Sequence, residues 1–412
     1  MNVFKFGGAS LKTSSAVRNM AGIVKTHQQK PLVVVVSAMG KTTNALEHIV
    51  NLYRQGLSFR KELTELKTYH INLARDLFTE KSVEQKIDDL FERLVEQLKP
   101  GPEDQVYDQV VSFGEIISSV IVCDFLAQSG VACSWKDARQ YILTDDCFRE
   151  GKVNWEITRK KIQSLVPELE NKIILTQGFI GGTADGLTTT LGREGSDYTA
   201  AIFASCLDAD AVTIWKDVPG VMSADPKRIP EAVVFAELPY KEAAEMTYYG
   251  ASVIHPKTIK PLAVKGIPLL VKSFDNPHLP GTRIHECHVD KLPPLIVFKE
   301  NQCLVSCRVT DYTFINEQQL SLLFQALSEL DIKINVMQNS AISFSFCIDY
   351  RESKLAALLE KLRHHFEVYY NTGLVLITVK NYDSQTFETY RKQNNLLLEQ
   401  SSRSTLQVLV KP

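Results

Sequence analysis

Short apolar runs alternate with longer stretches of helical pattern along the first two thirds of the chain. The apolar runs occupy residues 3–6, 32–36, 172–175, 211–215 and 267–271. Continuous apolar runs of this length are typical of strands that are buried on both faces of a parallel sheet. Because helical segments separate them, we predict a three-layer α/β fold with a mainly parallel sheet over residues 1–285.

One polar stretch interrupts this alternation without breaking the helical pattern. Residues 58–97 are highly charged and contain neither glycine nor proline. Glycine and proline are the strongest local breakers of regular structure, so their absence predicts helices here.

The pattern changes again near the end of the chain, after a polar segment with a Pro-Pro pair that predicts a linker at residues 286–297. Strand and helix patterns then follow in the order βαββαβ, which is typical of a ferredoxin-like α+β unit over residues 298–371. Residues 372–412 have the pattern of a strand, a helix and two strands, which predicts a shortened second unit of this kind. We expect the two units to share sheet edges or to pair between subunits, because an open edge promotes aggregation.

Composition and charge narrow the function classes. The length of 412 residues predicts two or three domains, and 46 basic against 48 acidic residues give a net charge of −2. This balance argues against a nucleic-acid partner or an anionic membrane surface. We find no apolar run of the roughly 18 residues needed to span a bilayer, and the first strand is charged, unlike a signal sequence. The eight cysteines are scattered without paired spacing, which predicts reduced thiols and a cytoplasmic location.

The first candidate for chemistry lies at the predicted start of a helix. Arg193, Ser196 and Asp197 lie within five positions of one another, beside Gly192 and Gly195. A guanidinium binds a carboxylate with two parallel hydrogen bonds, and a carboxylate binds an ammonium group. The cluster therefore predicts a site for a small zwitterion, although an N-capped surface turn would contain similar residues.

Two strand ends supply further candidates. Lys5 lies in an otherwise apolar strand that runs directly into Gly7 and Gly8, and such a turn can bring backbone N–H groups close to phosphate oxygens. Lys216 and Asp217 follow Trp215 at the end of a later strand, where open α/β sheets hold their ligands. Trp215 itself is a candidate to flank a base, but a core position is the favoured interpretation.

An ordered set of motifs resembles aspartate kinase, a member of the amino-acid kinase family with C-terminal ACT domains. The resembling segments are KFGGAS from Lys5, VVVVSAMGKTTNAL from Val33, SFGEIISS from Ser112, TQGFIGG from Thr176, TTTLGREGSDYTAA from Thr188, IWKDVPGVMSADPK from Ile214 and EMTYYGASVIHPKTI from Glu245. This resemblance implies a kinase domain at residues 1–285, an ACT domain at 298–371 and a shortened ACT-like unit at 372–412. It implies transfer of the ATP γ-phosphoryl group to the β-carboxylate of L-aspartate, giving 4-phospho-L-aspartate, the first step toward lysine, threonine and methionine.

The resemblance also implies roles for individual residues. Lys5 and Asp197 would be catalytic, with Lys5 neutralising phosphoryl charge and Asp197 also sharing the substrate ammonium with Glu115. The implied aspartate pocket comprises Ser37, Thr43, Glu115, Phe179, Thr190, Arg193 and Ser196, with Arg193 as the carboxylate clamp. The implied ATP-binding residues are Lys5, Phe6, Gly7, Gly8, Ser10, Lys216, Asp217, Lys227 and Lys257. Effector binding would involve Asn335, Gln338 and Asn339.

Cofactors and partners follow from the same resemblance. ATP would bind with Mg²⁺ held largely by its own phosphate oxygens, so no protein residue is assigned as a metal ligand. The ACT region implies a homodimer or a larger assembly. The sequence does not identify an effector, because Asn335 stands where some lysine-sensitive relatives have an acid.

Several positions depart from the family pattern. Glu194 replaces the usual glycine in the substrate turn, where a positive φ would strain it and a free carboxylate would weaken the Arg193 clamp. Ser252 replaces a nucleotide-side lysine, and Lys257 is a candidate to replace that charge. Met222 and Lys227 replace the common tyrosine and arginine of the nucleotide loop.

Two alternatives stay open. One alternative to an aspartate kinase is a catalytically weak, ACT-regulated amino-acid-binding protein, as Glu194 and Ser252 suggest. The other is another amino-acid kinase such as glutamate kinase. Residues 285–288, HECH, are of types that ligate metals, but they lie too close together in sequence for a typical metal site. A solvated turn is therefore favoured there. His255 is interpreted as a structural residue beside a helix start.

Overall fold

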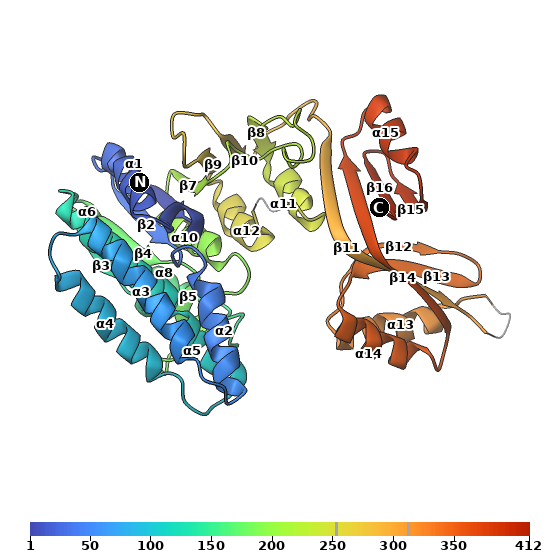
Figure 1. Cartoon of the computed structure of the whole chain (residues 1–412). Helices are drawn as coiled ribbons and strands as arrows, with labels where there is room; N and C mark the ends of the chain where they lie inside the picture. The colour runs from blue at the N-terminus through green and yellow to red at the C-terminus, as the bar shows by residue number, and fades with distance from the viewer. Residues whose placement is uncertain (252–253, 311–313) are drawn as a thin grey trace. The chain divides into compact units, whose positions relative to one another are not determined.

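The computed structural model describes residues 1–251, 254–310 and 314–412, and the chain forms two compact units (Figure 1). The first comprises Met1–Val221, Val234–Ala244 and Ser252–Val289. The second comprises Met222–Val233, Glu245–Ala251 and Asp290–Pro412.

The first unit is built on a mixed, mainly parallel sheet. In spatial order its strands are β3 (Cys133–Lys136), β4 (Ile173–Gln177), β2 (Leu32–Val36), β1 (Asn2–Phe6), β7 (Ala211–Lys216), β9 (Leu269–Ser273), β10 (Thr282–His285) and β8 (Glu237–Pro239). The strands from β3 to β9 pair in parallel, and β10 is antiparallel to β9. The sequence prediction of a mainly parallel α/β fold is therefore confirmed, with strand ends shifted by at most two residues.

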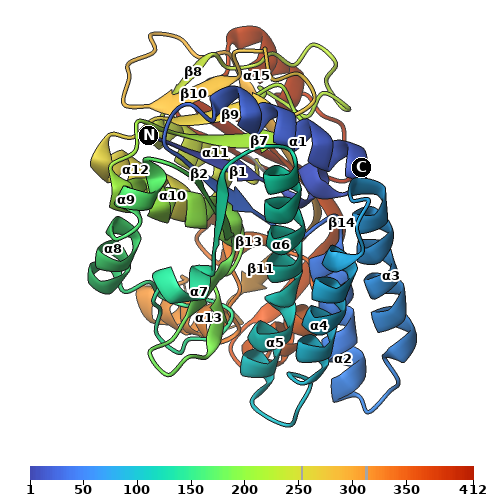
Figure 2. The same ribbon diagram turned by 90° about the vertical axis from the view of Figure 1, so that its left-hand side faces the viewer.

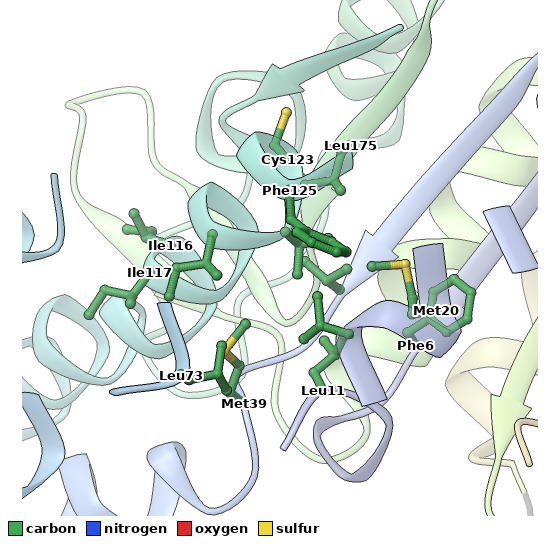
Figure 3. Packing of buried hydrophobic residues seen from close by; sticks show 14 of the residues in the cluster. Phe6, Leu11, Met20, Met39, Leu73, Ile116, Ile117, Cys123, Phe125 and Leu175 are labelled. Atoms are coloured by element: carbon green, nitrogen blue, oxygen red, sulfur yellow. The ribbon is translucent and has the colours of Figure 1, made fainter. Parts of the chain in front are cut away.

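Helices cover both faces of this sheet. Helix α10 (Gly195–Leu207) packs on β1, β2 and β7, and α8 (Trp155–Gln163) and α12 (Pro256–Lys265) pack against it. On the other face, α1 (Ser14–His27) and α6 (Phe113–Gln128) bury Phe4 and Phe6 of β1 in the main core. Figure 3 shows Phe6 beside Met20 of α1, and Phe125 of α6 belongs to the same cluster. Alternation along β1 turns Lys5 the other way, toward α10.

The charged stretch at residues 58–97 forms two helices, as predicted. Helices α3 (Arg60–Leu77) and α4 (Ser82–Val95) run side by side (Figures 1 and 2). Helices α2 (Thr42–Arg54) and α5 (Glu103–Val111) complete this layer.

One stretch of the described residues, Glu103–Gln128, is long and apolar enough by composition to cross a membrane. Its most apolar window is 83% buried, and its second half, α6, packs on β2, β3 and β4. In this structure the stretch is a core element of the first unit.

The second unit is one antiparallel sheet. In spatial order its strands are β12 (Ile334–Asn339), β13 (Ser343–Asp349), β11 (Leu295–Arg308), β14 (Glu367–Lys380), β16 (Thr405–Val410) and β15 (Leu396–Ser401). Helices α13 (Glu317–Glu329), α14 (Glu352–Leu362) and α15 (Ser384–Arg391) complete it. Among the described residues, three small apolar clusters lie along the sheet. One is built around Phe346 and Leu358, one around Leu376 and Leu409, and one around Val379 and Leu406.

The two central strands of this sheet are longer than the sequence pattern predicts. Strands β11 and β14 have 14 residues each and take part in both halves of the unit. Their pairing changes register between Lys299 and Gln302, where Asn301 has a positive φ of 55°. A bulge adds an unpaired residue and so breaks the alternation of apolar positions. For this reason the predicted boundary between residues 371 and 372 falls inside β14, and the predicted linker ends inside β11.

The turn at Gly281 provides a test of backbone geometry in the first unit. Gly281 has a φ of 75°, and a β-carbon there would lie 2.3 Å from the carbonyl oxygen of Val271. Gly281→Ala is therefore expected to lower the free energy of unfolding by about 3 kcal/mol or more, combining left-handed strain with a backbone clash. Denaturant unfolding measures this loss.

A matched control is Gly266→Ala. Gly266 has a similar φ of 65°, but nothing lies within 4 Å of its added β-carbon. The expected loss is only about 1 kcal/mol, from backbone strain alone. Equal losses in the two variants would show that the close approach at Gly281 does not constrain the turn.

Candidate functional site

Four neighbouring strands of the first unit end at the same edge of the sheet. Phe6 of β1 pairs in register with Val36 of β2 and with Trp215 of β7, and Val36 pairs with Gln177 of β4. The chain leaves β1 toward β2 on one side and reaches β7 on the other, so β1 is a topological switch point. Ligands in open α/β sheets bind at the carboxyl ends of the strands beside such a point.

A cavity of about 560 Å³ lies at this edge. Its wall includes Lys5 and Lys216 near the ends of β1 and β7, residues of the loops after β1, β2 and β4, the start of α10, and one buried acid from α6. It is lined by Lys5, Gly8, Ser37, Ala38, Gly40, Thr43, Glu47, Tyr107, Glu115, Arg149, Phe179, Thr190, Gly192, Arg193, Glu194, Gly195, Ser196, Asp197 and Lys216.

The buried lysine of β1 is paired with an acid of α10. The Lys5 Nζ lies 2.7 Å from Oδ1 of Asp197, and the two side chains form an ion pair. The two side chains are 11% and 4% exposed. A buried charge is tolerated only when a partner offsets its lost hydration, and here each group provides that partner for the other. Both remain on the cavity wall.

A second acid, Glu115, faces the cavity from the first turn of α6. One of its oxygens accepts a hydrogen bond from the Ala38 N–H at 3.2 Å, whereas Oε2 is buried without a hydrogen-bond partner. Burial raises the pKa of Glu115 to about 8, against the opposing effects of the backbone hydrogen bonds and of Lys5. An unsatisfied buried carboxylate oxygen on a cavity wall is suited to receive a cationic donor from a ligand.

Arg193 offers a guanidinium at the exposed rim of the same cavity. It lies in the turn before α10 and forms no ion pair with any other described residue. Gly195 closes this turn so tightly that a β-carbon would lie 2.8 Å from the ring of Phe179. Arg193 is thus held above the cavity by a turn that is packed against the strand-end loop of β4.

Glu194, next in the turn, adopts the left-handed conformation that the sequence analysis considered. Its φ is 53° and its ψ is 30°, a region that costs a residue with a side chain about 1–2 kcal/mol. Its Oε2 accepts a hydrogen bond of 2.9 Å from the backbone N–H of His255, at the start of α12. His255 caps that helix through Nδ1, which accepts from Lys257 N–H, so its interpretation as a structural residue is supported.

Hydrogen bonds fix two of the remaining predicted substrate residues, Phe179 and Thr190. Phe179 has a positive φ of 70°, and its N–H donates to Thr199 Oγ1 at 3.0 Å. Thr190 donates to Asp108 from both its backbone N–H and its hydroxyl, each at 2.8 Å. Ser37 and Thr43 line the cavity directly.

Four residues of the site are not predicted from the sequence. Asp108 is fully buried and also accepts the backbone N–H of Arg149 at 2.8 Å, and burial raises its pKa. Arg149 places a second guanidinium on the cavity wall, 3.9 Å above the ring of Tyr107. Tyr107 donates to Glu47. The one indication of these residues in the sequence was Asp108, because it is an acid inside an apolar helical run, YDQVV.

The predicted ATP-binding residues are only partly brought together. Lys5, Gly8 and Lys216 line the cavity, while Phe6 and Ser10 are buried in the core beneath it. Gly7 precedes a short 3-10 helix, η1 (Gly8–Leu11), and Asp217 is exposed outside the lining.

The other nucleotide-side candidates lie elsewhere. Lys257 lines a different cavity, with its Nζ 4.0 Å from Glu150, and Lys227 belongs to the second unit. Ser252 lies outside the described residues. Trp215 is only 2% exposed and is stacked on Phe6, so it is a core residue rather than a base platform.

The predicted effector residues all lie on β12 of the second unit. The Asn335 amide accepts from Lys299 at 2.8 Å and donates to Gln302 at 2.6 Å and to Asp349 at 2.9 Å. Gln338 and Asn339 are exposed. The role of these residues in effector binding stays a prediction.

Comparison with known proteins agrees with this architecture. The model of the amino acid kinase family matches residues 1–273. The lysine-sensitive aspartokinase 3 of Escherichia coli is 32% identical over 354 residues, which cover 84% of this chain and 78% of that protein. A crystal structure of E. coli aspartokinase III in complex with aspartate and ADP superimposes with a TM-score of 0.84 at 28% identity and covers all of this chain and 96% of that one.

Plant relatives are longer. The bifunctional aspartokinase/homoserine dehydrogenase 2 of Zea mays is 29% identical over 381 residues, which span 89% of this chain but only 41% of that protein. This chain therefore spans less than half the length of the bifunctional relatives. The family match and the E. coli relative are nevertheless sufficient to assign the family: the chain belongs to the amino acid kinases and, among them, to the aspartokinases.

Proposed function

We propose that this chain transfers the γ-phosphoryl group of ATP to the β-carboxylate of L-aspartate. The observation that carries the proposal is the single cavity lined both by Lys5, at the switch point of the sheet, and by Arg193, Glu115 and Asp197. Lys5 therefore provides a cation for phosphate. Arg193 provides a guanidinium for a zwitterion, and Glu115 and Asp197 provide two acids for it.

Aspartate would bind with a carboxylate on Arg193 and with its ammonium between Glu115 and Asp197. The unsatisfied Oε2 of Glu115 supports this placement, because an ammonium donor would satisfy it. The second guanidinium, Arg149, lies on the same wall and is a further candidate to orient a carboxylate.

The reaction requires no nucleophile from the protein, since the substrate carboxylate is already ionised and attacks the γ-phosphorus directly. Catalysis then consists of positioning and of stabilising charge on the transferring group. Lys5 serves the second purpose, and Asp197 holds its ammonium at the cavity wall until phosphate arrives. Mg²⁺ would enter with ATP, bound largely by the phosphate oxygens, and would neutralise part of their charge.

Assembly and location extend the proposal. A homodimer or a larger oligomer would form through the second unit, whose sheet leaves β12 and β15 as edge strands. A cytoplasmic location stays a prediction, since the relatives include both a bacterial protein and chloroplastic proteins.

The proposal is tested by ATP- and Mg²⁺-dependent formation of aspartyl hydroxamate, with glutamate as the rival substrate. Wild-type protein is expected to use aspartate in strong preference to glutamate. Lys5→Ala should lower kcat by about 100-fold or more while changing the KM for ATP much less, because Lys5 acts mainly on charge that develops in the transition state.

Lys25→Ala removes an exposed lysine from α1 and serves as the control. It should retain wild-type kcat, and thermal unfolding of Lys5→Ala checks that the lost activity does not reflect an unfolded chain. A Lys5→Ala enzyme with near wild-type kcat, or a wild type that prefers glutamate, contradicts the proposal.

The raised pKa of Glu115 predicts that aspartate binding depends on pH. Below about 8 the free enzyme holds Glu115 protonated, and the carboxylate must ionise before it can bind an ammonium group. The Kd for aspartate should therefore fall about tenfold per pH unit from pH 6 toward 8 and level off above it. Calorimetry in buffers of different ionisation enthalpy should also detect proton release.

Glu115→Gln cannot titrate and is the matched variant. It should bind aspartate weakly at every pH and lose the slope below pH 8. A wild-type Kd that is constant from pH 6 to 8, or a slope that survives in Glu115→Gln, argues against this role for Glu115.

Glu194 provides a test of the substrate turn. Because its carboxylate accepts from His255 N–H, Glu194→Gln retains an acceptor and should leave the KM for aspartate within about twofold. Glu194→Ala loses the bond and keeps the left-handed strain, so the KM should rise by about five- to tenfold as Arg193 loses its fixed position. Steady-state kinetics measure both variants. A clearly lower KM in Glu194→Gln would mean instead that the carboxylate opposes Arg193.

A further inference from the structure

A second cavity of the first unit lies among helices α8, α10 and α12. Its volume is about 490 Å³, close to that of the first cavity. We propose that it binds a small molecule that combines an aromatic body with an anionic group, either a phosphate or a carboxylate. No step of the proposed reaction uses this cavity.

The charge of its lining selects for anions. Five cations surround it, Lys152, Arg159, Lys257, Lys260 and Lys265, against one acid, Glu150. Two of the cations are balanced, since Lys265 pairs with Asp208 at 2.6 Å and Lys257 lies 4.0 Å from Glu150.

The other three cations have no such balance. Lys152, Arg159 and Lys260 form no ion pair within the described parts of the chain. Arg159 is half-buried, so its guanidinium is partly desolvated and a bound anion would gain more from it than from a fully hydrated charge.

The remaining lining is apolar and aromatic. Trp155 and Tyr198 meet edge to face, with ring centroids 6.5 Å apart, and both rings line the cavity. Leu191 and Pro261 are buried beneath, and Val264, 79% exposed, completes the apolar rim. An aromatic ring stacked here would remove apolar surface from water and leave its anionic group toward Arg159 and Lys260.

The position of the cavity links it to the proposed reaction. Leu191 and Tyr198 stand on either side of the turn that carries Arg193 and Asp197, and Lys257 lies 3.5 Å from the position of a β-carbon on Gly192. A ligand in the second cavity would therefore contact the side of the substrate turn that faces away from the first cavity. The expected consequence, which rests on the proposed function, is a change in aspartate affinity.

Isothermal titration calorimetry with phenyl phosphate and with phenylacetate tests the binding itself. The full chain is first saturated with ADP, Mg²⁺ and aspartate, so that the first cavity is filled. We expect saturable binding of at least one of the two anions below about 1 mM, and no binding of neutral phenol. The stronger of the two identifies the preferred anionic group.

Three variants locate the site. Arg159→Ala and Lys260→Ala should each weaken binding by about tenfold, the loss typical of one charge-assisted contact. Lys161→Ala removes an exposed lysine from the same helix as Arg159 and should bind within twofold of wild type. Lys260 is exposed, so its variant tests the site even if Arg159→Ala fails to fold.

The outcomes separate this proposal from the proposed function. Absence of saturable binding up to 10 mM, wild-type affinity in both Arg159→Ala and Lys260→Ala, or binding seen only without ADP would overturn it. A chain that binds phenyl phosphate as expected but fails to phosphorylate aspartate would overturn the proposed function and leave this site intact.

Discussion

The ion pair between Lys5 and Asp197 connects the centre of the sheet to the helix that carries the substrate turn. Lys5 belongs to β1, between strands on both sides, and Asp197 lies in the first turn of α10. Both groups are almost fully buried, and breaking such a pair by removing one member typically costs about 3–5 kcal/mol. The same contact thus fixes α10 against β1 and keeps a cation at the cavity wall.

The order of the strands explains why the other polar groups converge on this pair. With β2 and β4 on one side of β1 and β7 on the other, residues at or just after the end of each strand reach the same cavity. Glu115 joins them because α6 begins beside the loop after β2, where its carboxylate accepts the Ala38 N–H. Residues distant in sequence thus become neighbours through the parallel pairing of the strands and through the position of α6.

The sequence was informative where one local pattern decided the outcome. Buried strands were visible as apolar runs, and the Lys5 strand and the Arg193 turn were visible as charges placed among apolar or glycine residues. Arg149 and Asp108 were missed because their positions depend on a hydrogen bond between two distant segments. Lys257 is predicted to bind ATP from its place in HPKTI, and this role stays a prediction, although its Nζ lies 4.0 Å from Glu150 in this structure. Strands β11 and β14 were cut short because a bulge interrupts their alternation.

The most direct test is a crystal structure of the chain with Mg²⁺, ADP and aspartate bound together. We predict that the Lys5 ammonium contacts a phosphate oxygen while the Arg193 guanidinium contacts an aspartate carboxylate, both inside the cavity at the end of β1. Nucleotide and amino acid bound in separate cavities, too far apart for in-line transfer, would contradict the account.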